Sequence, residues 1–262
     1  MRARRILAAI PIRHGGVSEY IGASLILPIR DHNPRSRFPR AVLALIAINT
    51  VIYLLLTALD SLDFLSFDSE LNAQQAGAIP LEITTLTDIG LRDLVPPPFT
   101  ILTSMFLHGG ILHLVGNMWF LWIFGDNVED RMGSLKFVAF YLIAGVVGAV
   151  SQCLLMPSSP HPMVGASGAV AGVLGGYALL FPRARILSLL FFFRVSIPAW
   201  VFLGGWFAAQ LFLVNHSGIA WMAHVGGFLA GLGLVRLFAA PRRIPVLEME
   251  YLPPPRDRDY SK

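Results

Sequence analysis

The chain has 262 residues, of which 55% are hydrophobic and only 14% are charged, and its mean hydropathy is +0.64. Soluble domains carry about 25% charged residues, so this composition excludes a globular enzyme with a fully hydrated surface and indicates a protein embedded in lipid. The formal net charge is +4, but the arginines lie in the tails and connecting loops, which indicates membrane orientation rather than a nucleic-acid partner.

Six apolar segments are long enough, or nearly long enough, to cross a bilayer as helices, which takes roughly 20 mostly apolar residues. In chain order, they cover about residues 40–59, 112–125, 135–155, 166–181, 198–214 and 219–238. Residues 99–107 extend the second segment backwards, and the fourth segment is short and rich in glycine. Residues 186–193 are also apolar, but arginines bracket them, which favours an interfacial stretch between the fourth and fifth helices.

These segments predict an all-α, polytopic membrane protein with three parts. Residues 1–39 form a loosely ordered N-terminal extension, residues 40–240 form a six-helix membrane domain, and residues 241–262 form a disordered, proline-containing tail. Basic residues are frequent before the first span and in alternate connections, and they are scarce in the others. By the positive-inside rule, this pattern places both termini in the cytoplasm, at a cell (inner) membrane.

Polar side chains inside membrane spans are costly and usually functional, and four of them stand out. His113 and Asn117 lie at positions i and i+4 of the second span, so they share one helix face. Ser167 opens the fourth span, and His224 lies about five residues into the sixth. With the predicted topology, all four lie at one depth near the outer surface, although they come from three different spans.

Glycines at a four-residue spacing follow both Ser167 and His224 in their spans. They are Gly168, Gly172 and Gly176 in the fourth span, and Gly227 and Gly231 in the sixth. Small residues at this spacing let two helices approach closely. The spacing therefore predicts that the Ser167 hydroxyl comes within hydrogen-bond reach of His224.

A serine hydroxyl is a weak nucleophile until a base takes its proton, and a neutral histidine can take that proton and later give it to a leaving amine. Ser167 and His224 are therefore predicted to form a catalytic dyad, since no carboxylate lies in the fourth or sixth span. The Ser167 backbone N–H and the side chains of Asn117 and His113 are candidate donors to an oxyanion. Taken singly, each residue has a structural explanation, as a helix cap or a packing contact, but their coincidence favours catalysis.

Four motifs, in order along roughly residues 28–240, resemble those of the rhomboid intramembrane serine proteases. They are residues 108–118, the loop with Gly125, Glu129, Arg131 and Gly133, residues 165–168, and residues 223–227 followed by Gly231. The resemblance implies a six-transmembrane-helix rhomboid fold that needs no cofactor or metal and that cleaves transmembrane protein substrates near the outer face of the bilayer. By position, it implies Ser167 as nucleophile, His224 as base, and His113 and Asn117 as oxyanion donors.

One departure from the family pattern concerns the support of the histidine. Some relatives have an aromatic residue one helical turn beyond the nucleophile, and this chain has Ala171 there. Other neighbours, such as the backbone of the glycine stripe, must then steady His224.

Three alternatives remain open beside this interpretation. A catalytically inactive relative that only binds membrane proteins usually lacks the serine or the histidine, and both are present here. A membrane zinc protease would use His108, His113 and His224, but the sequence has no His-Glu-x-x-His and no carboxylate among those histidines on the outer side. A channel or transporter predicts repeat symmetry and midplane charges, and the sequence shows neither.

Overall fold

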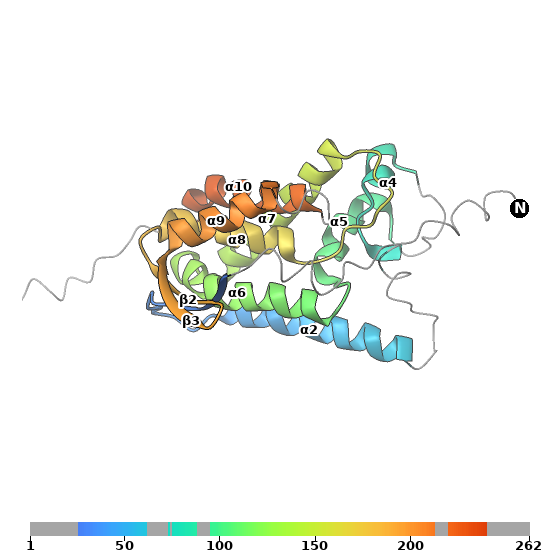
Figure 1. Ribbon diagram of the computed structural model, residues 1–262. Coiled ribbons are helices and arrows are strands. Elements are labelled where there is room, and N and C mark those ends of the chain that lie inside the picture. The colour runs from blue at the N-terminus through green and yellow to red at the C-terminus, as the bar shows by residue number, and fades with distance from the viewer. Residues whose placement is uncertain (1–25, 62–72, 74, 88–94, 213–219, 240–262) are drawn as a thin grey trace, which may run out of the picture.

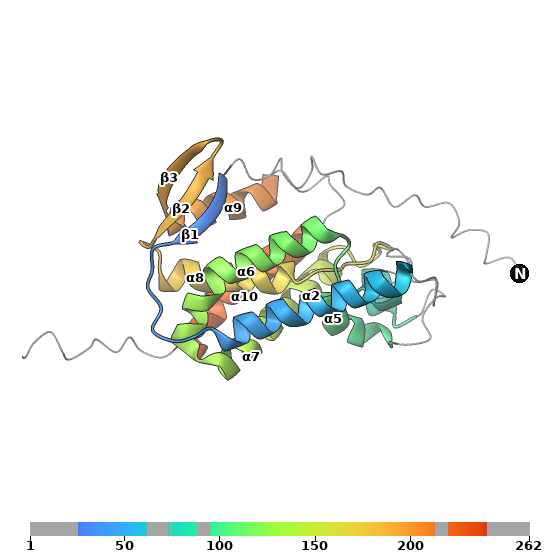
Figure 2. The same ribbon diagram turned by 90° about the horizontal axis from the view of Figure 1, so that it is seen from below.

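The structure is a computed structural model, and it describes residues 26–61, 73, 75–87, 95–212 and 220–239. Within this part the chain is mostly helical, as the apolar segments predict, and the long helices form one bundle (Figures 1 and 2). These helices are α2 (Arg40–Ser61), α6 (Ile111–Met132), α7 (Ser134–Leu155), α8 (Ser167–Leu180), α9 (Ala199–Phe212) and α10 (Trp221–Phe238).

Three of the described helices are long and apolar enough to cross a membrane on their own, namely α2 over Arg40–Leu59, α7 and α10. A fourth candidate is Pro97–Phe106 together with α6, two parts that meet at a bend of 78°. The shorter helices α8 and α9 are also apolar. A polytopic membrane protein is therefore supported, and the count of six spans stays a prediction.

The bend corrects the expected backward extension of the second span, because residues 99–107 do not continue α6 in a straight line. They form the short helices η3 (Pro97–Phe99), α5 (Thr100–Thr103) and η4 (Ser104–Phe106). Gly110, which precedes α6, has extended backbone angles, so the Gly109-Gly110 pair interrupts the helix. The remaining short helix, α4 (Pro80–Thr85), begins with proline, whose missing N–H is harmless at a first helical position.

α8 lies at the centre of the bundle, and every residue from Gly168 to Tyr177 is buried. It packs against α6, α7, α9 and α10. The outward face of α2, in contrast, exposes large apolar side chains such as Val51, Leu54 and Leu55. Exposed apolar surface of this extent is typical of a face that meets lipid or a partner. The bundle therefore has an apolar outer face on α2 and a buried central helix, α8.

A three-stranded antiparallel sheet was not expected from the sequence. Its strands are β1 (Ile26–Asp31), β2 (Arg185–Leu190) and β3 (Phe193–Pro198), in the order β1-β2-β3. The stretch 186–193 thus forms a strand and a hairpin turn, and its location at a lipid interface stays a prediction. At the turn, Phe191 has a φ of +53° and Phe192 is 94% exposed. β1 takes residues from the predicted N-terminal extension, while the rest of that extension and the tail 241–262 lie outside the described residues.

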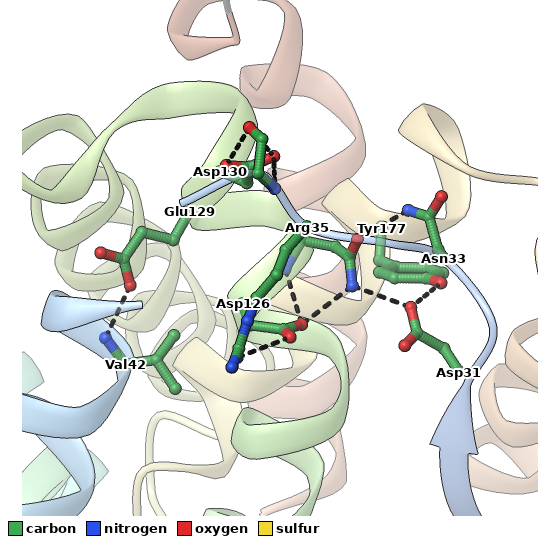
Figure 3. A network of polar contacts seen from close by, with 10 residues as sticks. Asp31, Asn33, Arg35, Val42, Asp126, Glu129, Asp130 and Tyr177 are labelled. Atoms are coloured by element: carbon green, nitrogen blue, oxygen red, sulfur yellow. Dashed lines mark hydrogen bonds and ion pairs between the residues drawn. The ribbon is translucent and has the colours of Figure 1, made fainter. Parts of the chain in front are cut away.

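Hydrogen bonds of one carboxylate fix the sheet to the end of the bundle where α6 finishes (Figure 3). The Asp31 carboxylate, at the end of β1, accepts hydrogen bonds from the Tyr177 hydroxyl of α8 at 2.6 Å and the Asn127 amide of α6 at 2.8 Å. Asn127 in turn accepts a hydrogen bond from the Asn33 amide at 2.7 Å. The strand that begins the described chain is therefore held by two helices of the bundle.

A second carboxylate at the same end caps helix α2 (Figure 3). Glu129 of α6 accepts hydrogen bonds from the backbone N–H groups of Ala41 and Val42, both at 2.9 Å, and from the Ser134 hydroxyl at 2.6 Å. The first N–H groups of a helix lack partners within it, and negative charge is favourable there. Glu129 therefore holds α2 against α6.

Candidate active site

Ser167 is the first residue of α8, and the turn before it requires glycine at position 165. Gly165 has a φ of +121°, which residues with a Cβ rarely adopt. A Cβ there would also lie 2.7 Å from the His113 ring. The Gly165 N–H donates to the Ser104 carbonyl oxygen at 2.9 Å. The loop that delivers Ser167 is therefore fixed both by its backbone and by its attachment to η4.

His224 lies in the first turn of α10, with its Nε2 atom 2.8 Å from the Oγ atom of Ser167. Facing glycines let the two helices come this close. A Cβ at Gly227 would collide with the backbone of Gly168, and one at Gly231 would collide with the backbone of Gly172. The close approach predicted from the glycine spacing is confirmed, and it brings the hydroxyl and the imidazole together.

The second nitrogen of the His224 ring has a partner that sequence reasoning missed. Its Nδ1 atom lies 2.7 Å from the Oε1 atom of Gln210, which comes from α9 and is only 6% exposed. Ala171 is fully buried in α8 and presents no ring at the position where relatives have one. Gln210 is an amide inside the predicted fifth span, so the cost of burying it in lipid is the signal that could have singled it out.

A second glutamine, which the sequence analysis did not single out, fixes the start of α10. The Oε1 atom of Gln152, on α7, accepts a hydrogen bond from the backbone N–H of Met222 at 3.0 Å. The residue before the helix, Ala220, offers no side-chain cap, so Gln152 satisfies from another helix an N–H that the helix itself leaves unpaired. It thereby holds the turn that carries His224.

His113 and Asn117, both on α6, face the loop that leads to Ser167. A Cβ at Gly165 would lie 2.7 Å from the His113 ring and 3.6 Å from the Asn117 Nδ2 atom. Asn117 is buried, and its amide nitrogen has no hydrogen-bond partner in the described structure. Buried donors are normally paired, so an amide N–H in this place is available to a bound molecule.

Histidines in this part of the structure do not gather into a metal site. The His108 and His113 rings meet edge to face, with 5.2 Å between their centroids. Among the described residues, however, no group of three or more histidine, cysteine, aspartate or glutamate side chains is placed to hold a metal ion. The set His108, His113 and His224, considered for a zinc protease, therefore does not form such a group.

A small cavity of about 30 Å³ adjoins Ser167. Its walls come mainly from small side chains and from methionine, and they include Met105, Gly145, Ala149, Gly168 and Ala223. A larger cavity of about 380 Å³ lies at the other end of α6, among charged residues such as Arg37 and Asp130. Ser167, His224 and Asn117 all lie at the end of the bundle that contains the smaller cavity.

A family model matches the part of the chain that contains the site, and several known proteins are similar to this chain. The family model described as the Rhomboid domain matches residues 97–241. Rhomboid protein 1, mitochondrial, of Saccharomyces cerevisiae is 36% identical over 148 residues, which are 54% of this chain and 42% of that protein. Rhomboid protease GluP of Bacillus subtilis is 32% identical over 144 residues, which are 54% of this chain and 26% of that protein.

Another relative matches a larger share of this chain. RHOMBOID-like protein 4 of Arabidopsis thaliana is 29% identical over 220 residues, which are 78% of this chain and 54% of that protein. The chain thus spans from about a quarter to about half of the length of these relatives. The family model, in contrast, covers more than half of this chain and includes α6, α7, α8, α9 and α10. The protein therefore belongs to the rhomboid family.

Proposed function

We propose that the chain is an intramembrane serine endopeptidase that cleaves the transmembrane segments of other membrane proteins near the outer face of the bilayer. The observation that carries this proposal is the 2.8 Å separation between the Ser167 Oγ atom and the His224 Nε2 atom. A hydroxyl paired with an imidazole is the arrangement of an activated nucleophile and its base. The name of one relative, Rhomboid protease GluP, supports the same chemistry.

The first half of the reaction forms an acyl-enzyme. The Ser167 oxygen attacks the substrate carbonyl carbon while His224 Nε2 accepts the hydroxyl proton. The carbonyl oxygen becomes an oxyanion, for which the Asn117 amide, the His113 ring and the Ser167 backbone N–H are the donors. When the intermediate collapses, the C–N bond breaks and His224 gives its proton to the leaving amine.

The second half releases the new carboxyl end. His224 is neutral again and takes a proton from a water molecule, whose oxygen attacks the ester carbonyl. The ester bond then breaks, and the proton returns to the Ser167 oxygen. The small cavity beside Ser167, lined by glycine, alanine and methionine, favours substrates with a small side chain next to the cleaved bond.

The membrane arrangement is part of the proposal. Six spans, with both termini in the cytoplasm, fit the distribution of basic residues, and membrane lipid surrounds the bundle. This arrangement suits a cell (inner) membrane, and the relative named as mitochondrial makes a mitochondrial membrane the alternative. Protease accessibility of a C-terminal tag in sealed vesicles distinguishes a cytoplasmic tail from an external one.

Labelling with a fluorophosphonate probe tests the proposed nucleophile directly. The purified chain in detergent is expected to become labelled and to cleave a panel of single-span reporter proteins, whereas Ser167→Ala and His224→Ala lose both activities and keep their helical circular dichroism. Cleavage retained by Ser167→Ala would overturn the proposal. A folded wild-type chain that is neither labelled nor active would favour the inactive, substrate-binding relative.

A further inference from the structure

The second nitrogen of the His224 ring carries an inference that rests on the proposed function and deepens it. We propose that Gln210 is a positioning residue, which holds His224 in the tautomer and orientation whose Nε2 atom accepts the serine proton. Gln210 contacts the reacting groups only through the histidine, with its Oε1 atom 2.7 Å from Nδ1.

The two ring nitrogens of a neutral imidazole play different roles. One of them carries the proton and the other accepts, and the partner of each decides which form is present. The Oε1 atom of Gln210 can only accept, so the proton of the ring lies on Nδ1 and is donated to it. Nε2 is then left as the acceptor, at 2.8 Å from the Ser167 hydroxyl, which is the form that a general base requires.

The orientation of the glutamine amide is itself fixed. Its Nε2 atom reaches the carbonyl oxygen of Trp206, one helical turn earlier in α9, at 3.5 Å. An amide that donates toward Trp206 presents its oxygen, and not its nitrogen, to His224. The α9 backbone therefore sets which end of Gln210 meets the imidazole.

Burial makes this contact a strong constraint. Gln210 is 6% exposed, and an unpaired polar group in so dry a place is costly, so both partners favour keeping the bond. The Trp206 ring lies 6.3 Å from the His224 ring, at 38°, and packs on it from the same helix. With Ala171 offering no ring from α8, the support of His224 comes from α9.

The contact also strengthens during the reaction. When His224 accepts the serine proton, it becomes an imidazolium, and its Nδ1–H donates to Gln210 as a charged donor. Hydrogen bonds to charged groups stabilise more than neutral ones, so Gln210 favours the transition state over the resting state. A neutral amide achieves this without placing a second charge in the apolar bundle, where an added carboxylate would be expensive to desolvate.

Substitutions that separate shape from hydrogen bonding test the proposal in the purified full-length chain. Gln210→Met keeps the length of the side chain and removes the acceptor, and it is expected to lower kcat by about 10–100-fold with little change in KM. Gln210→Glu keeps the acceptor and is expected to retain much more kcat than Gln210→Met. A purely structural role predicts instead that both variants lose activity in proportion to their lost thermal stability.

The pH profile gives a readout that packing alone does not change. A carboxylate beside Nδ1 favours the imidazolium, so in Gln210→Glu the acid limb of the kcat profile shifts to higher pH. Gln210→Met loses the acceptor that stabilises the imidazolium, so its acid limb shifts to lower pH. Among the described residues, the His113 ring of α6 and the His108 ring before it lie in contact at the same end of the bundle, and both variants leave these residues unchanged.

The outcomes are distinct from those of the proposed function. Wild-type kcat in Gln210→Met, or an unshifted acid limb in an active Gln210→Glu, overturns the positioning role while the Ser167-dependent activity stands. Absence of Ser167-dependent labelling in the wild type overturns both proposals. If Gln210→Met does not fold, the retained kcat and the shifted profile of Gln210→Glu decide the matter.

Discussion

The buried asparagine side chains of α6 differ in whether they have hydrogen-bond partners. Asn127 donates to Asp31 and accepts from Asn33, so it joins β1 to α6. Asn117, on the same helix, is also buried, but its amide nitrogen has no partner in the described structure. A paired buried amide contributes to stability, whereas an unpaired one contributes little, because removing it leaves no other group unsatisfied.

Asn117→Ala is therefore expected to slow cleavage by about 10²–10³-fold, the usual effect of losing one oxyanion donor, with little change in thermal stability. Cleavage rate and detergent melting temperature measure the two effects separately. Asn127→Ala is the matched control, because it removes paired hydrogen bonds and should lower the melting temperature. An unchanged rate in Asn117→Ala removes this residue from the mechanism.

Helices α8 and α10 depend on each other through their glycines, and the sequence spacing was sufficient to predict this contact. The glycines of α10 are not equivalent, however. A Cβ at Gly231 would collide with the backbone of Gly172, whereas one at Gly233 would meet nothing within 4 Å. The spacing predicts which helices meet, but only the packing shows which glycines the contact requires.

Gly231→Ala is expected to destabilise the protein by about 1–3 kcal/mol, as overpacking does, and to weaken Ser167-dependent labelling, because it forces α10 away from α8. Gly233→Ala in the same helix should be neutral or slightly stabilising, since alanine is the better helix former. Thermal unfolding and fluorophosphonate labelling of the pair give the comparison. Equal melting temperatures for the two variants contradict the close contact.

The three-stranded sheet joins segments that are far apart in the sequence, because β1 lies near the N-terminus and β2 and β3 lie between α8 and α9. β1 pairs with β2, and β3 runs directly into α9, the helix that carries Gln210. Asp31 fastens this sheet to α6 and α8. Burial raises the pKa of Asp31 from 3.8 to about 6; the nearby Asp126 carboxylate acts in the same direction, and the hydrogen bond from Tyr177 opposes it.

The raised pKa of Asp31 predicts a pH dependence of stability. The folded protein binds a proton at Asp31 more tightly than the unfolded chain does, so this contribution is complete below about pH 4 and is lost as the pH rises through about 6. Relative to Asp31→Asn, which cannot ionise, the wild type is expected to lose about 1 kcal/mol between those values, after allowance for solvent screening. Parallel melting-temperature curves for the two proteins between pH 4 and 7 would contradict this.

The amino-acid sequence was enough to predict that the protein is embedded in a membrane, where the long helices lie and that α8 pairs with α10. These features follow from hydropathy and from spacing along one helix, which are local properties. Three contacts became known only from the folded molecule: Gln210 meets His224, Gln152 fixes the start of α10, and β1 pairs with β2. Each of these contacts joins separate elements. A buried amide or the backbone of a strand requires a hydrogen-bond partner. The identity of that partner depends on which elements the fold places side by side.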